Sequence, residues 1–205
     1  WRPDLVIGFV TMKGGYHETT SAGLAVNVPG YMFVGENDLD YRIENLTGIF
    51  LNHRPFGALW TLAMEQGAGH TQITDRILLD GYFHDVISLR VPNEISTDEP
   101  VVLLPVSESI GWFGNRSSFE IGSFECYNFG EDTSSWLPSR EAAILWQSFV
   151  SENSVTDTIP CPSDNVDLNI SFSADWNLVG LPLALENNGY LELFPNAVQN
   201  TLYSF

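Results

Sequence analysis

Apolar residues follow two alternating patterns along the first half of the chain. Continuous apolar runs at residues 5–12, 31–35 and 58–64 have the length and composition of strands buried on both faces. Apolar residues at spacings of three and four over residues 40–54 and 74–89 predict two helices. The alternation of strands and helices predicts a parallel sheet flanked by helices, and therefore an α/β fold.

The starts of the expected helices carry side chains that suit N-caps. Asp38 or Asp40 would cap the first helix. Thr71 or Thr74 would cap the second. Ser139 is expected to cap a third helix with a clear apolar stripe.

The segment between the second and third helices has no strong periodicity. Residues 101–106 are apolar but include Pro105, which predicts an edge strand or an extended segment. The residues from there to Ser134 are expected to be mostly irregular. Six aromatic residues are candidates for a substrate cleft, although most are expected to pack in the core: Trp60, Tyr82, Phe83, Trp112, Phe113 and Trp136.

A change of character near residue 153 predicts two parts. Residues 1–152 form the expected α/β domain, and residues 153–165 are polar, contain two prolines and predict a linker. Residues 166–172 alternate between apolar and polar positions, as in a strand with one buried face. Residues 166–205 are therefore expected to be a β-rich segment that is truncated at its end.

Charge and cysteine content exclude several classes of protein. The 26 acidic and 8 basic residues give a net charge of −18, which would repel nucleic acid phosphates. No apolar run approaches the roughly 20 residues of a membrane span. Cys126 and Cys161 lack zinc-finger spacing, and both a disulfide in an exported protein and two buried thiols remain open.

Asp38 and His70 are the candidate catalytic residues, because each ends a predicted strand. The carboxyl ends of neighbouring parallel strands bring side chains together. A histidine there suits a general base, and a carboxylate would orient its imidazole. Glu36 is a rival for the acid role and Asp40 a weaker one. His17 and His84 are interpreted as ordinary loop and helix histidines.

These residues stand in strings that resemble a known family. The strings GEND, HRPFGALW and GAGH resemble the C-terminal half of α/β-hydrolases, particularly secreted esterases, over residues 1–152. The resemblance implies hydrolysis of a small-molecule or polymeric ester by a Ser–Asp–His triad, with Asp38 as the acid and His70 as the base.

The nucleophile that the family requires is absent from the sequence. No GxSxG string occurs, and the nearest string, at residues 107–111, follows His70 and precedes no helix. Ser109 is therefore interpreted as a loop residue. The serine and the oxyanion donors are expected upstream of Trp1, which makes the chain a fragment that is inactive alone.

Two other interpretations remain open. One is a non-catalytic secreted surface or carbohydrate-binding protein on a hydrolase-like scaffold. The other is a single active site assembled from this chain and a separate partner chain.

The C-terminal segment has a resemblance of its own. The string SFSADWNLVGLPL resembles a GWNLxSLPL-type segment of secreted bacterial proteins, with Asp175 where that pattern has glycine. The resemblance implies a secreted or cell-surface protein. No cofactor or metal is expected, because the four histidines have no ligand spacing and the acidic run at residues 36–40 lacks the EF-hand pattern.

Overall fold

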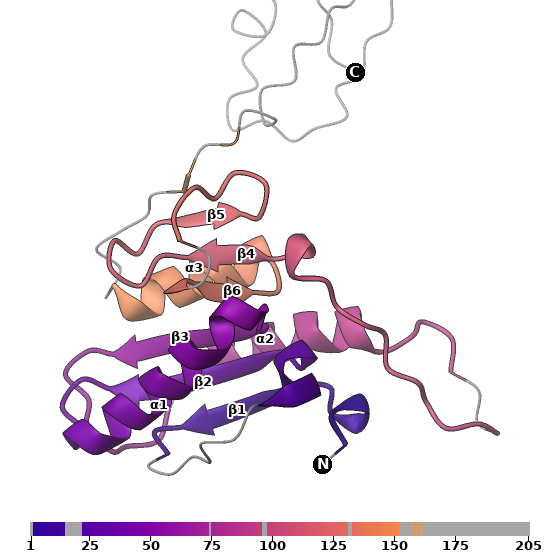
Figure 1. The fold of residues 1–205 in the computed structure, drawn as a ribbon, viewed down its shortest axis with the longest axis horizontal. Helices are drawn as coiled ribbons and strands as arrows, with labels where there is room; N and C mark the ends of the chain where they lie inside the picture. Colours follow the sequence, from indigo (N-terminus) through magenta and orange to yellow (C-terminus); the bar gives the residue numbers. More distant parts are fainter. Residues whose placement is uncertain are drawn as a thin grey trace, which may run out of the picture. The chain divides into compact units, whose positions relative to one another are not determined.

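The residues that the structure describes all lie in the first part of the chain. The computed structural model in Figure 1 describes residues 2–14, 22–73, 75–95, 98–130, 133–151, 158–159 and 161. The chain divides into two units, Trp1–Asn165 and Val166–Phe205, and all described residues belong to the first. The strand and segment predicted for residues 166–205 lie outside the described residues.

A three-stranded parallel sheet forms the centre of the first unit. Its strands are β1 (Phe9–Met12), β2 (Gly30–Gly35) and β3 (Trp60–Glu65), in the order β1-β2-β3. This confirms the predicted parallel α/β arrangement. The first strand is shorter than expected, because Pro3–Leu5 forms a 3-10 helix, η1, that proline favours at its start.

Helices cover both faces of this sheet. The helices are α1 (Asp40–His53), α2 (Arg76–Arg90) and α3 (Arg140–Val150). In Figure 1, α1 lies in front of the sheet and α2 behind it.

Alternate residues of β2 point to the two faces. Tyr31 and Phe33 pack with residues of α2 and α3, whereas Met32 and Val34 pack with Leu46 and Phe50 of α1. Every residue of β2 is buried, as expected of a central strand in a parallel sheet.

The helix starts confirm one predicted N-cap and correct two. Ser139 Oγ accepts a hydrogen bond from the Ala142 N–H, as predicted. The second helix is capped by Asp75, whose carboxylate accepts from Leu78 N–H, and Thr71 has a different partner. The N-cap of α1 is Leu39, so neither Asp38 nor Asp40 caps it. Thr74 lies outside the described residues.

The segment before α3 is mostly irregular, as expected, but it carries two short strands that the sequence does not predict. These strands, β4 (Trp112–Gly114) and β5 (Ile121–Ser123), form an antiparallel sheet with β6 (Ser135–Leu137), in the order β5-β4-β6. Most of the six aromatic candidates are core residues, as predicted: Trp60, Tyr82, Phe113 and Trp136 are buried.

Strand β6 covers the outer edge of β3. The Ser135 hydroxyl accepts a hydrogen bond from Leu62 N–H at 3.0 Å and donates one to Leu62 O at 2.9 Å. Thr61 Oγ1 donates to Trp136 O beside it. An unpaired strand edge is a template for association, so this cover closes the sheet on the β3 side.

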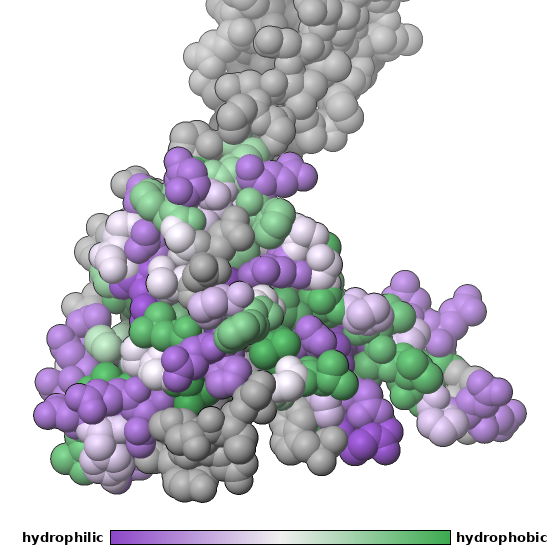
Figure 2. Space-filling view, in the orientation of Figure 1, coloured by the Kyte–Doolittle hydropathy of each residue, from purple (hydrophilic) through white to green (hydrophobic). Residues whose placement is uncertain are grey.

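Residues 98–106 form an extended arm with no strand pairing. Val101, Val102 and Leu104 are exposed there, and the arm's hydrophobic side chains are visible at the right of Figure 2. Residues 101–106 are predicted to be an edge strand or an extended segment, and the structure shows an extended segment. No helix among the described residues is long and apolar enough to cross a membrane.

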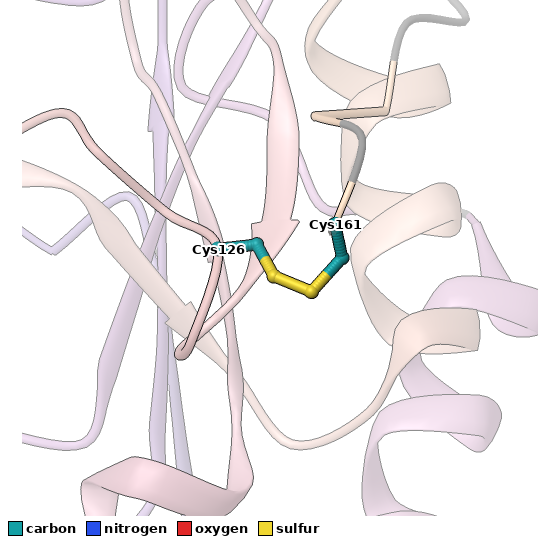
Figure 3. Close-up of a disulfide and its surroundings, with 2 residues drawn as sticks. All are labelled: Cys126 and Cys161. Atoms are coloured by element: carbon teal, nitrogen blue, oxygen red, sulfur yellow. A yellow bond between two sulfur atoms is a disulfide. The ribbon is translucent and has the colours of Figure 1, made fainter. Parts of the chain in front are cut away.

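Cys126 and Cys161 form a disulfide (Figure 3), which decides between the two open alternatives for these cysteines. Their Cα atoms lie 5.1 Å apart. Near this bond, Ile159 N–H donates to Ile121 O of β5, and Ile159 packs against the aromatic cluster under the small sheet. The disulfide therefore holds Thr158 and Ile159 beside β5.

Candidate functional site

Asp38 and His70 meet at the carboxyl edge of the parallel sheet. Asp38 follows β2, and His70 follows β3, at the arrowheads toward the left of Figure 1. The His70 ring Nδ1 lies 2.9 Å from Asp38 Oδ2, although the residues are 32 positions apart. The structure thus brings the two predicted site residues into one hydrogen-bonded pair.

Both carboxylate oxygens of Asp38 are occupied. Oδ2 faces His70, and Oδ1 accepts from Leu39 N–H at 2.8 Å and from Arg42 Nη1 at 3.0 Å. The side chain is 2% exposed. Burial alone would raise the pKa of Asp38, but the hydrogen bonds from His70, Leu39 N–H and Arg42 outweigh it and lower the pKa to about 2.

The ionised carboxylate determines the tautomer of His70. A carboxylate only accepts hydrogen bonds, so Nδ1 of His70 donates the proton, and in the neutral ring Nε2 carries the lone pair. The His70 side chain is 51% exposed. Among the residues that the structure describes, no hydroxyl or thiol contacts its Nε2.

The loop that carries His70 folds back over the end of β2. Asn37 N–H donates to Ala68 O at 2.8 Å. A Cβ atom at Gly35 would lie 2.5 Å from the carbonyl oxygens of Ala68 and Gly69, so only glycine permits this approach. Gly67 adopts a φ of +64°, which turns the chain at the start of the loop.

The rival acids have other positions. Glu36 Oε2 accepts from Gly67 N–H at 2.7 Å and so holds the histidine loop. Asp40 is exposed in the first turn of α1. Among the described residues, His70 donates a hydrogen bond to Asp38 and to neither rival.

Ser109 lies at the opposite end of β3 from His70. It belongs to the 3-10 helix η4 (Glu108–Ile110), and its hydroxyl contacts that of Ser107 at 2.8 Å. Its neighbour Glu108 binds Arg54, whose guanidinium also donates to Ala58 O, just before β3. This position is incompatible with a role as the nucleophile for His70.

The two other described histidines, His53 and His84, lie on helices and have other partners, and the His53 ring Nδ1 lies 2.7 Å from Ile49 O. His84 is exposed on α2 and contacts Asp85 at 3.3 Å. His17 lies outside the described residues.

Sequence reasoning missed two cationic residues at the site. Arg42 binds Asp38 from one turn along α1, and the i, i+4 spacing was the signal for this contact. Lys13 follows β1 and donates to Glu65 and to Thr71, the neighbour of His70. No local pattern relates residues 13 and 65.

The fold and the site define a mixed α/β protein with an acid–histidine pair at the ends of adjacent parallel strands. Among the described residues, no group of three or more His, Cys, Asp and Glu side chains is arranged to hold a metal ion. No protein-family model matches the sequence, and comparison with curated proteins and with solved structures gives no match. The likeness to α/β-hydrolases stays a prediction.

Proposed function

We propose that this chain supplies the acid and the base of an exported carboxylic ester hydrolase. The observation that carries the proposal is the hydrogen bond between His70 Nδ1 and Asp38 Oδ2 across the ends of β2 and β3. An ionised, buried carboxylate behind an exposed imidazole is the arrangement that general-base catalysis requires.

In this proposal, Nε2 of His70 takes the proton of a serine hydroxyl as its oxygen attacks the ester carbonyl carbon. Asp38 stays ionised and stabilises the imidazolium. The imidazolium then gives its proton to the departing alkoxide, which leaves an acyl-enzyme. Water then hydrolyses the acyl-enzyme. His70 takes a proton from water as the water oxygen attacks the acyl carbon, and the imidazolium returns a proton to the serine oxygen as the carboxylic acid leaves.

The serine comes from outside these 205 residues, since no GxSxG string occurs in them. A further parallel strand would join at β1, because β6 already covers β3 and no described strand pairs with the outer edge of β1. The contact of Lys13 with Thr71 shows that the histidine loop reaches the end of β1. A nucleophile after such a strand would lie about one strand spacing, roughly 5 Å, from Lys13.

The test joins the chain to the segment encoded directly upstream and assays a short-chain ester. His70→Ala and Asp38→Asn are each expected to lower kcat by about 10³-fold or more. His84→Ala, an exposed histidine on α2, serves as the matched control and should retain activity. Unchanged turnover in His70→Ala would remove this residue from the mechanism, and an upstream segment without GxSxG would remove the proposal.

A second candidate is a non-catalytic surface or carbohydrate-binding protein. The lack of a nucleophile beside Nε2 among the described residues favours it. Such a protein would bind a polysaccharide without turnover, and His70→Ala would leave that binding unchanged.

Export is supported by the disulfide, since structural disulfides persist mainly in oxidising compartments. Fractionation of the producing cells, with detection of the chain outside the cytoplasm, tests it. Retention in the cytoplasm with reduced thiols would contradict it.

A further inference from the structure

Lys13 is a buried lysine at the carboxyl end of β1. Its side chain is 1% exposed, and its ammonium group donates to Glu65 and, at 2.9 Å, to Thr71 Oγ1. Lysine is almost never buried without paired charge. The backbone of Lys13 also has a φ of +55°, a left-handed conformation that is unfavourable for a residue with a side chain. The surrounding structure therefore holds this residue in place.

The two contacts of Lys13 span the site. Lys13 follows β1, Glu65 ends β3, and β2 lies between these strands. Glu65 begins the loop that carries His70, and Thr71 follows His70 directly. Lys13 thus grips this loop at both of its ends.

Other bonds of the loop are made within it, where Thr71 N–H donates to Gly69 O, and with the residues after β2. Glu65 O accepts from Glu36 N–H, and Glu36 Oε2 accepts from Gly67 N–H. Asp38 holds the His70 ring itself. These contacts hold the start and middle of the loop, whereas Thr71 is an exposed residue whose hydroxyl is bonded to Lys13.

We propose that Lys13 is a positioning residue that holds the loop of residues 65–71 so that His70 stays on Asp38. This role rests on the proposed function, since positioning matters there for catalysis. The ammonium group also pairs with the carboxylate of Glu65, at the start of the loop. Lys13 acts through Thr71 and Glu65 and touches no reacting atom.

Two variants of the full 205-residue chain test this role. Thr71→Val removes one hydrogen bond from an exposed residue, and Lys13→Met removes both contacts. Thr11→Val on β1 is the matched control, because no hydrogen-bond partner of Thr11 Oγ1 is found in the structure as described. The readouts are the His70 Nδ1–H proton resonance and the amide hydrogen exchange of Asn37 and Gly67.

Both test variants are expected to broaden or remove the Nδ1–H resonance and to speed the exchange of the two amides at least tenfold. Thr11→Val should change neither. If Lys13→Met does not fold, the resonance and the amide exchange of Thr71→Val alone test the proposal. An unchanged resonance and unchanged exchange in folded Thr71→Val and Lys13→Met would overturn the proposal.

These readouts do not depend on ester turnover. In the chain joined to its upstream segment, Thr71→Val should lower kcat at least fivefold with little change in KM. Absence of turnover in the parent protein would contradict the proposed function. The resonance measurement would still test the positioning role of Lys13. Full turnover in Thr71→Val would overturn the role of Lys13 alone.

Discussion

The carboxylate of Asp38 links the site to the stability of the fold. Its pKa is lowered from 3.8 to about 2, so folding is favoured by this group above about pH 4, and this contribution is lost as the pH falls toward 2. The stability difference between the wild type and Asp38→Asn should therefore be present at pH 5 and shrink below about pH 4. Urea unfolding across this range measures it. A difference that is independent of pH would contradict the ionised pair.

Arg42 should lower the pKa of Asp38, and this effect can be tested with the Asp38–His70 contact left in place. Arg42→Met deletes the hydrogen bond from Nη1 to Asp38 Oδ1, so the pKa of Asp38 should rise from about 2 toward its ordinary value. Carboxyl ¹³C shifts followed against pH measure this change. Arg76→Met, at the exposed start of α2, is the control and should leave the pKa of Asp38 unchanged. No rise in Arg42→Met would mean that His70 and Leu39 N–H suffice to lower the pKa.

For single residues, the sequence identifies Asp38 and His70 as candidates, but it does not reveal the contact that Lys13 makes across the sheet. Asp38 and His70 are visible because each ends an apolar run. Lys13 stands in a Lys-Gly-Gly turn, which predicts only a change of direction. Its partner Glu65 is 52 positions away, and only the sheet order brings the two together.

Among the elements, β6 contacts the edge of β3 through the hydroxyl of Ser135 as well as through that of Thr61. Ser135→Ala leaves the buried Leu62 N–H without its Ser135 acceptor, which should cost about 1–3 kcal/mol of the free energy of unfolding. Ser88→Ala, on the exposed face of α2, should change it by less than about 0.5 kcal/mol. Denaturant unfolding of both variants compares them. Equal values would mean that β6 does not stabilise β3 through this hydroxyl.

The success of element prediction follows the length of the pattern. The helices α1, α2 and α3 each carry several apolar turns, and the six-residue strands β2 and β3 overlap the apolar runs at residues 31–35 and 58–64. The strands β4, β5 and β6 have three residues each, too few to show alternation. Gly114 of β4 looks like a loop signal, yet a Cβ atom there would lie 2.2 Å from the Trp146 ring. Glycine is needed at position 114 because the Trp146 ring packs against it, and no local pattern in the sequence reveals this contact.

The fold class of the first unit is visible in the sequence, whereas its second sheet and its covalent closure are not. The strand–helix rhythm alone predicts the parallel sheet, because each unit of that rhythm is local. The small sheet depends on the pairing of β4 with β5 and with β6, and the disulfide joins Cys126 to Cys161 across a sequence separation of 35. Two cysteines at a separation of 35 are equally compatible with free thiols.

For the whole first unit, the disulfide should add stability without shaping the candidate site. It closes a loop with a sequence separation of 35, which in the chain-entropy model stabilises the fold by about 3–4 kcal/mol. Reduction, or the Cys126→Ser/Cys161→Ser variant, should lower Tm accordingly. The Nδ1–H resonance of His70 should persist, because that pair is held by residues of β2, α1 and the loop after β3.

Thiol titration of the unfolded, unreduced chain comes first and should find no free thiols among the two cysteines. Reduction of the folded chain then separates the two effects. A lower Tm with an intact His70 resonance supports a disulfide that holds Thr158 and Ile159 beside β5. Loss of the resonance would show that the small sheet also orders the acid–histidine pair, since β6 contacts β3 directly.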